Sequence, residues 1–302
     1  MFHRHSPSRG PGSPEVLGFH DAPTGSAQYL VWDPASLDAA VIDVVQDFDP
    51  RSAATGHDNA EWVLGQIAGR GLRLRWILDT HPHADHLTDS HWLRQRTGAP
   101  NGIGAKVVEI ARLWEGIYNL PGGFHPAADF DHLFADGETF RLGGIPVRVM
   151  LHPGHTLGSV SYVIGDAAFV HDTFMQPDVG TSRADFPGGS SGALYDSLMS
   201  ILALPDRTRL FVGHDYGTEG RAAPAWESTV AEQRAHNAHV GGGVDRAAFM
   251  RLRDDRDATL PLPDRMLHAL QVNLRAGRLP DPEADGHSYF RIPANRFGGG
   301  AR

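Results

Sequence analysis

The sequence predicts an α/β fold, in which strands and helices alternate along the chain. Short runs of β-branched and aromatic residues end in glycine, proline or aspartate turns, and segments with apolar residues at helical spacing follow them. This order of strands and then helices recurs in two successive blocks, which favours layered sheets covered by helices. With 302 residues, of which 41% are hydrophobic, the chain is long enough to bury a sizeable core.

The first block is expected to open with a hairpin, because the turn-forming pair Asp33-Pro34 separates two β-rich runs. A segment with helical spacing follows and ends before two glycines. An apolar strand and a second helix complete the block. The elements that we expect are strands at residues 27–32, 39–44 and 72–79 and helices at residues 59–68 and 87–96.

The second block is a series of strands with glycine turns, followed by a long segment rich in glycine and proline. Loops of this length inside a compact domain are usually functional. The strands are expected at residues 139–142, 147–151, 160–164, 167–170 and 209–212, the loop at 175–192 and a helix at 194–202. After Tyr216 the pattern predicts surface helices at 226–239 and 245–256, then a helix and an irregular tail at 261–290.

Composition limits the function classes. A formal net charge of −9 argues against a general nucleic-acid binder or a protein that binds anionic membranes, because phosphate contacts need a basic surface. Cysteine is absent, so the chain has no disulfide, no cysteine nucleophile and no thiolate metal ligand. Every residue that binds a metal must therefore offer nitrogen or oxygen.

We expect three regions along the chain. Residues 1–14 are rich in Ser, Pro, Gly, His and Arg and lack the apolar core of a secretory signal, which predicts a disordered tail. Residues 15–222 carry the catalytic domain, and residues 223–302 form an extension that packs on it. No run approaches the roughly 18 apolar residues of a membrane span. Because Lys106 is the only lysine among 27 basic residues, a bacterial, cytoplasmic protein is expected.

The most informative motif is T-H-P-H-A-D-H at Thr80–His86, directly after an apolar run that is typical of a buried strand. Imidazole nitrogen and carboxylate oxygen are ligands that zinc and iron share, and a strand end is a rigid place to hold them. The motif therefore predicts a metal site. The alternative, a polar turn without a metal, would need three histidines and an aspartate to gather there by chance.

The motif H-x-H-x-D-H, here His81, His83, Asp85 and His86, resembles the signature of the metallo-β-lactamase fold superfamily. Further segments follow in the order of that family, and each comes after an apolar run. They are H-P-G-H-T, which supplies His155, A-F-V-H-D-T, which supplies Asp172, and L-F-V-G-H-D-Y, which supplies His214. The resemblance covers roughly residues 29–216 and implies an αββα four-layer sandwich with a C-terminal helical extension.

Two metal arrangements stay open. If His81, His155 and Asp172 alone bind, they form a 2-His-1-carboxylate triad for one Fe(II) per chain. If all the candidates bind, two Zn(II) ions are held in the arrangement of a dinuclear hydrolase. His83, Asp85, His86 and His214 are then ligands of the second metal; otherwise they orient the iron ligands by hydrogen bonds.

The segment G-T-S-R-A-D-F at Gly180–Phe186 favours iron, since it resembles a segment of the persulfide dioxygenases, also called sulfur dioxygenases, within this superfamily. The segment that starts at Leu202 also favours iron, since it is similar to the segment that closes the site in those dioxygenases and in the related bacterial β-lactamase-like hydrolases. The segments that start at Val230 and Gln271 are similar to the latter group. One departure is Thr181, which stands where some of those dioxygenases have a cysteine.

The resemblance implies oxidation of glutathione persulfide, or of a similar thiol persulfide, by O2 to sulfite and thiol, in an enzyme that is expected to be a homodimer. The alternative is a glyoxalase II-like dinuclear zinc hydrolase of a thioester, lactone or related ester. A third possibility is a metal-binding protein without turnover, which would predict missing ligands; none is missing from the sequence.

The remaining candidates have two interpretations each. Arg183 either binds a substrate carboxylate or pairs with Asp185. Tyr216 either contacts the substrate, as a catalytic candidate with Asp85, or packs. His152 and His171 neighbour the ligands in sequence, but adjacent residues of a strand point to opposite faces, which predicts structural roles for both.

Overall fold

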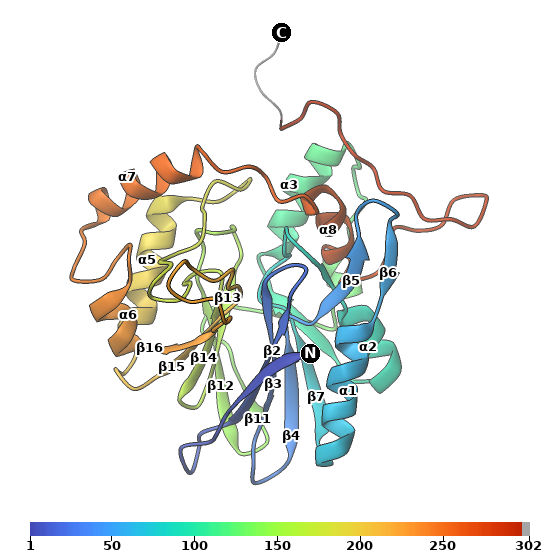
Figure 1. Ribbon diagram of the computed structural model, residues 1–302. Coiled ribbons are helices and arrows are strands. Elements are labelled where there is room, and N and C mark those ends of the chain that lie inside the picture. The colour runs from blue at the N-terminus through green and yellow to red at the C-terminus, as the bar shows by residue number, and fades with distance from the viewer. Residues whose placement is uncertain (298–302) are drawn as a thin grey trace.

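The computed structural model describes residues 1–297, and these form two sheets packed face to face with helices on both outer sides. Figure 1 shows α1 and α2 on one side of the layered strands and α5 and α6 on the other. The expected αββα sandwich with a C-terminal helical extension is confirmed.

The first sheet lies towards the N-terminus and contains both antiparallel and parallel neighbours. Its strands, in spatial order, are β1 (Phe2–Ser6), β2 (Glu15–Asp21), β3 (Ser26–Trp32), β4 (Asp38–Ile42), β7 (Arg73–Leu78), β9 (Asn101–Gly104) and β10 (His132–Phe134). The prediction of a disordered tail at residues 1–14 is wrong for its first part. The edge strand β1 pairs antiparallel with β2. The polar composition did not indicate this strand, because backbone hydrogen bonds form independently of side-chain polarity.

The second sheet is built mostly from neighbouring strands in sequence order. It contains β11 (Thr139–Leu142), β12 (Ile145–Leu151), β13 (Val160–Ile164), β14 (Ala167–His171), β15 (Arg209–Val212) and β16 (Glu227–Thr229). The last strand, β16, lies beyond the expected domain boundary at residue 222. The sandwich therefore continues into the region that the sequence assigned to the extension, because β16 pairs with β15 along its whole length.

Alternation along the strands divides the apolar residues between two cores. In β3, Tyr29 and Val31 face the core between the sheets, whereas Leu30 faces the core beneath the first pair of helices. Val63 of α1 and Leu93 of α2 pack into that second core. Both faces of the sheet are thus covered, which accounts for the near-continuous apolar runs in the sequence.

Six of the helices lie in segments where the pattern predicted them, with ends shifted by a few residues, whereas the two at residues 107–118 and 126–129 were not predicted. The helices are α1 (Asp58–Arg70), α2 (Ser90–Thr97), α3 (Val107–Tyr118), α4 (Pro126–Asp129), α5 (Ser191–Leu202), α6 (Val230–His236), α7 (Arg246–Asp257) and α8 (Met266–Asn273). Within the described residues, no helix is both long and apolar enough to cross a membrane.

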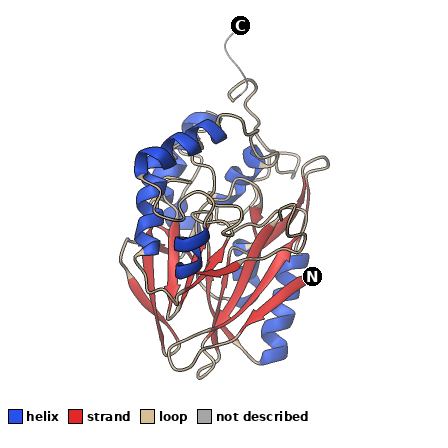
Figure 2. Ribbon diagram, turned by 60° about the vertical axis from the view of Figure 1, so that its left-hand side comes forward, coloured by secondary structure: helices blue, strands red, loops and turns tan. Residues whose placement is uncertain are grey.

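Long loops gather at one end of the sandwich, as Figure 2 shows. A small sheet of β6 (Ala54–Gly56), β5 (Val45–Asp49) and β8 (Leu87–Thr88) lies beside the motif after β7. The segment between β14 and α5 forms no helix and no strand beyond an isolated bridge from Phe174 to Thr181, as its composition predicts. This end of the fold brings the candidate ligands together.

Candidate metal centre

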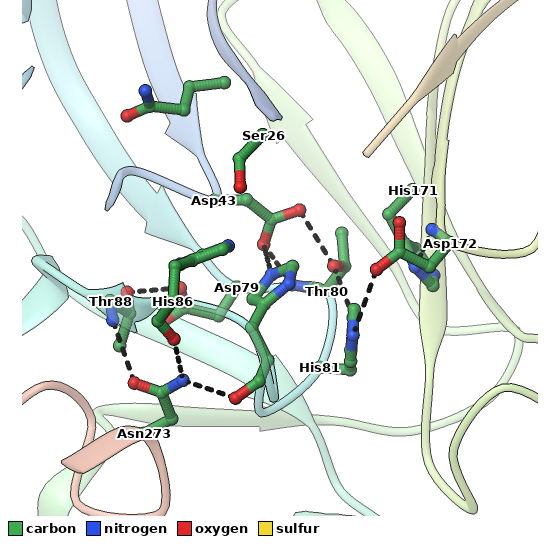
Figure 3. A network of polar contacts seen from close by, with 12 residues as sticks. Ser26, Asp43, Asp79, Thr80, His81, His86, Thr88, His171, Asp172 and Asn273 are labelled. Carbon is green, nitrogen blue, oxygen red and sulfur yellow. Dashed lines mark hydrogen bonds and ion pairs between the residues drawn. The ribbon is translucent and has the colours of Figure 1, made fainter. Parts of the chain in front are cut away.

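The histidine motif begins where β7 ends and is fully enclosed. His81, His83 and His86 are each only 1% exposed. Asp43, at the end of the neighbouring strand β4, fixes the start of the loop: its carboxylate accepts hydrogen bonds from the Thr80 backbone N–H and hydroxyl, both at 2.8 Å. This network, drawn in Figure 3, holds the motif in place before any metal is considered.

His81, His155 and Asp172 come from three distant parts of the sequence and converge. The Nε2 atoms of His81 and of His155 each lie 3.6 Å from Oδ2 of Asp172. Two ligand atoms of one ion, with bonds of about 2.1 Å, lie roughly 3–4 Å apart. Each of these two distances therefore fits a pair of ligands of one metal ion.

The other candidates gather next to this triad. His83, Asp85 and His86 each offer a ligand atom within 4.8 Å of the others, and so do Asp85, Asp172 and His214. His214 lies between the two carboxylates, with Nδ1 at 2.5 Å from Asp172 Oδ1 and Nε2 at 2.5 Å from Asp85 Oδ2. The arrangement leaves both roles open for these residues, as ligands of a second ion or as groups that orient the first.

Unpartnered nitrogen atoms support metal binding. Among the described residues, Nε2 of His81, Nδ1 of His83 and Nε2 of His171 are buried without a hydrogen-bond partner, whereas Nε2 of His83 lies 3.1 Å from Asp43 Oδ1. Buried polar atoms without partners are costly, and a metal ion is one physical reason to keep them. The donor set consists of nitrogen and oxygen only, which fits iron or zinc.

In His81 and His155, the ring nitrogen that does not face Asp172 contacts a protein oxygen. His155 Nδ1 hydrogen-bonds to the Arg183 carbonyl oxygen at 2.8 Å, and His81 Nδ1 lies 3.1 Å from the Thr80 hydroxyl. Such contacts fix the ring orientation and the tautomer of a metal-binding histidine. Both Nε2 atoms are consequently directed at Asp172.

The charges of the site are mutually dependent. Burial would raise the pKa of Asp172, but the His214 imidazole beside it offsets this, and the pKa lies below its ordinary value. Burial opposes the charge on His214, yet Asp172 and Asp85 raise its pKa well above the ordinary value. The pKa of His86 falls to about 4, first through burial and then through the neighbouring His83. At neutral pH the site thus holds anionic carboxylates around His214 and a neutral His86.

His171 differs from its prediction. Its ring lies 4.8 Å from that of His81, and the pair forms a ligand-like group with Asp172. The alternation argument fails because β14 has an irregular register between Phe169 and His171, and His171 adopts a positive φ of 34°. At such a position two successive side chains can share one side of the strand. His152 is buried and hydrogen-bonds to Ser161 Oγ at 2.7 Å, as its predicted structural role requires.

Arg183 is engaged within the protein. Its guanidinium donates to both carboxylate oxygens of Asp185, at 2.6 and 2.8 Å, and to the Pro261 carbonyl oxygen at 2.6 Å. The ion pair with Asp185 is therefore present in the structure, while substrate binding by Arg183, which lines the cavity next to the cluster, stays a prediction. Tyr216 is 68% exposed and stacks on His214, with ring centroids 5.8 Å apart.

A cavity of about 300 Å³ opens beside the cluster. Asp85, His155, Asp172 and His214 line one part of it, and Tyr216 is also in its wall. The remaining wall comes from the loop after β14 and from the segment around the end of α7. A small molecule in this cavity would reach the candidate metal ligands directly.

Two important residues were missed from the sequence. Asn273 of α8 donates to the carbonyl oxygens of His83 and His86 and accepts from the Thr88 backbone N–H, each at 2.8 Å. Figure 3 shows these three contacts meeting at one amide. Asp43 was missed although an aspartate between two apolar runs is an available signal; for Asn273 the chain offers only the resemblance of the segment at Gln271.

Comparisons with known proteins agree with this geometry. Residues 23–214 match the metallo-beta-lactamase superfamily. A beta-lactamase hydrolase-like protein from Xylella fastidiosa is 55% identical over 96% of this chain and 67% of its own length, so this chain spans about two thirds of it. The mitochondrial persulfide dioxygenase ETHE1 of Homo sapiens is 29% identical over 89% of this chain and 91% of its own length. The crystal structure of ETHE1 from Myxococcus xanthus has a TM-score of 0.69 and 30% identity, covering 87% of this chain and 99% of that one.

Proposed function

Because the chain belongs to the metallo-beta-lactamase superfamily, whose members are metal-dependent enzymes, we propose that it is a non-haem Fe(II) persulfide dioxygenase. The reaction converts a thiol persulfide, O2 and water into the thiol, sulfite and two protons. The outer sulfur is oxidised and both oxygen atoms are reduced, so atoms and electrons balance without another reductant. The substrates are the persulfide, such as glutathione persulfide, and O2.

One observation carries the proposal: two imidazoles, His81 and His155, approach the same oxygen of Asp172 at 3.6 Å. This is the donor set of a 2-His-1-carboxylate triad. When bound, Fe(II) would supply open positions at which sulfur and dioxygen can react. Similarity over most of the chain to a protein named persulfide dioxygenase also supports it.

The surrounding residues orient and shelter the reactants. The Arg183 carbonyl and the Thr80 hydroxyl fix the two imidazoles. His214 holds a proton between Asp85 and Asp172, where it can balance charge as an anionic sulfur group enters. Phe186, which lies edge-on to His155 at 5.2 Å, excludes water from that side of the cavity.

A dinuclear zinc hydrolase of a thioester, lactone or related ester is the second candidate. The observation that favours it is the second ligand group, His83, Asp85 and His86, whose ligand atoms lie within 4.8 Å of one another. The hydrolase-like name of the 55% identical relative supports it as well.

Metal analysis of protein purified without oxygen separates the two candidates. We expect one iron per chain, and oxygen uptake with matching sulfite release when glutathione persulfide is added. Two zinc ions per chain, with cleavage of a thioester and no oxygen uptake, would replace the dioxygenase with the hydrolase. Both metals must be measured on the same preparation that is assayed.

A further inference from the structure

The cavity beside the metal cluster is lined by three arginines, which is unusual in a chain with a net charge of −9. They are Arg183 in the loop after β14 and Arg253 and Arg256 in α7. A cation in such a cavity attracts an anionic ligand only if the protein has not already neutralised it. The partners of each arginine therefore decide what the cavity can bind.

Two of the three arginines are neutralised internally. Arg183 pairs with Asp185 through two hydrogen bonds. Arg253, which is 1% exposed, donates to Asp257 one turn later in α7, at 2.9 and 2.7 Å, and to the Thr181 carbonyl oxygen at 3.0 Å. Both guanidiniums thus hold the wall of the cavity together and have their charges compensated.

Arg256 differs from the other two. It lies in the last turn of α7, is exposed, and within residues 1–297 its guanidinium has no hydrogen bond and no carboxylate within 4 Å. Its charge acts on a neighbouring group: burial, and then the charges of Arg253 and Arg256, together lower the pKa of His239 to about 4. Arg256 is therefore the uncompensated cation among the described residues of this cavity.

The rest of the lining is suited to a small, partly apolar molecule. Besides the metal-binding groups, it offers Met175, Val179, Phe186, Leu260 and Pro263. The cavity is thus a space of about 300 Å³ with the candidate metal ligands in one part, apolar walls and a free guanidinium at the end of α7. A ligand that fits would carry its reacting sulfur towards the metal ligands and a carboxylate towards Arg256.

We propose that Arg256 binds a carboxylate of the substrate and thereby selects carboxylate-bearing thiol persulfides. This inference rests on the proposed function, since it names the substrate class of the same site. Guanidinium pairs with carboxylate through two parallel hydrogen bonds, and a charged hydrogen bond contributes about 1.5–3 kcal/mol. A loss of that size corresponds to roughly 10- to 100-fold in affinity.

Steady-state kinetics of Arg256→Ala test the assignment with two substrates. For glutathione persulfide, which carries carboxylates, we expect KM to rise about tenfold or more while kcat changes less than about twofold. For the persulfide of 2-mercaptoethanol, which has the same persulfide group but no carboxylate, KM should not change. Arg256→Lys should recover part of the loss. Equal changes for the two substrates, or none, would overturn the assignment.

Arg251→Ala is the matched control, because Arg251 is an exposed arginine of the same helix that does not line the cavity. It should behave as the wild type in every assay. An Arg251→Ala variant as impaired as Arg256→Ala would mean that the charge of the whole helix, and not the contact at residue 256, is responsible, and the assignment would fail.

Calorimetric binding of glutathione to the metal-loaded protein separates this inference from the proposed function. We expect Kd to increase at least about tenfold in Arg256→Ala and to stay constant in Arg251→Ala. A wild type that takes up no oxygen with either persulfide would refute the dioxygenase, whereas the calorimetric comparison would still decide on Arg256. No binding by the wild type, or equal Kd values, would refute the anion site.

Discussion

At the scale of single residues, His214 distinguishes the two metal arrangements. Its two ring nitrogens each lie 2.5 Å from a carboxylate, one of Asp172 and one of Asp85. In a mononuclear iron site it acts through those contacts, by holding a proton and orienting Asp172. In a dinuclear site it is itself a ligand, so its removal has a different effect on metal content.

We predict that His214→Ala keeps one iron per chain and loses most of its activity, because the triad of His81, His155 and Asp172 is intact while Asp172 loses its neighbour. Elemental analysis with an oxygen-uptake assay measures both. Asp172→Ala is the control that should lose iron and activity together. If His214→Ala drops from two metal ions to one, the dinuclear hydrolase is the better description; if Asp172→Ala keeps full metal and activity, the site assignment is wrong.

His152 gives a pH prediction that does not depend on metal ligation. Burial lowers its pKa to about 4 from an ordinary 6.5, and its ring is held by Ser161. The unfolded chain therefore binds more protons between these values, so the stabilisation is complete above pH 6.5 and is lost as the pH falls towards 4. The free energy of unfolding should fall by about 2 kcal/mol between pH 7.5 and 5 on account of this group.

Urea unfolding of the wild type and of His152→Gln at both pH values measures this contribution. The variant should be less stable at pH 7.5, because glutamine does not reproduce the buried contacts of the imidazole, but its stability should depend less on pH by about 2 kcal/mol. Parallel pH dependence in the two proteins would show that His152 is not the group responsible.

The residues of the candidate site could be predicted where they belong to a recognisable sequence motif. His81, His83 and His86 stand together in one short segment, and His155, Asp172 and His214 each end an apolar run. The opposite-face argument for His171 is wrong because its position depends on a local break in the strand, at a φ of 34°, which alternation cannot anticipate; its structural role stays a prediction. From the sequence, Arg183 could bind a substrate carboxylate or pair with Asp185. Only the side-chain geometry shows that the pair with Asp185 forms.

At the scale of elements, the C-terminal extension is part of the site. Asn273 of α8 holds the carbonyl oxygens of the metal-binding motif, while Asn237 after α6 donates to the Gly180 carbonyl oxygen at 2.8 Å in the long loop. The Asp257 carboxylate accepts from the Ala184 backbone N–H at 2.8 Å. The sequence predicts these helices well, but their partners lie 57 to 190 residues away in the chain, and periodicity carries no information on such contacts.

Asn273→Ala should destabilise the protein by about 2–4 kcal/mol, because it leaves the His83 and His86 carbonyls and the Thr88 N–H unpaired in a buried position. It should also weaken metal binding at least about tenfold, since the motif loses its support. Chemical unfolding and a metal competition titration measure the two effects.

Asn237→Ala is the matched control, because Asn237 is another buried asparagine that binds a loop carbonyl but does not touch the motif. It should cost similar stability and leave metal affinity within about twofold. If both variants weaken metal binding equally, general destabilisation explains the effect, and Asn273 has no specific role in positioning the motif.

At the scale of the whole molecule, the sandwich is the part that the sequence predicted best. The strands at residues 139–142, 160–164 and 209–212 were predicted with their observed bounds. The order of the strands within each sheet and the pairing of β1 could not be predicted from the pattern, because they depend on contacts between distant segments. The homodimer that the family resemblance implies stays a prediction.

Metal removal should destabilise the whole fold, because the loop at Thr80–His86 links both sheets through buried groups. Without an ion, His81, His83 and His171 keep buried nitrogens without partners. An ion present at about 1,000 times its dissociation constant stabilises the folded state by about 4 kcal/mol, and for a chain of this size that corresponds to a Tm roughly 6 °C higher. Scanning calorimetry before chelation, after it and after anaerobic readdition of Fe(II) should show this difference and its recovery. The Tm of Asp172→Ala should change neither on chelation nor on readdition of Fe(II). A wild-type Tm that is the same with and without the metal would mean that the cluster binds no ion tightly.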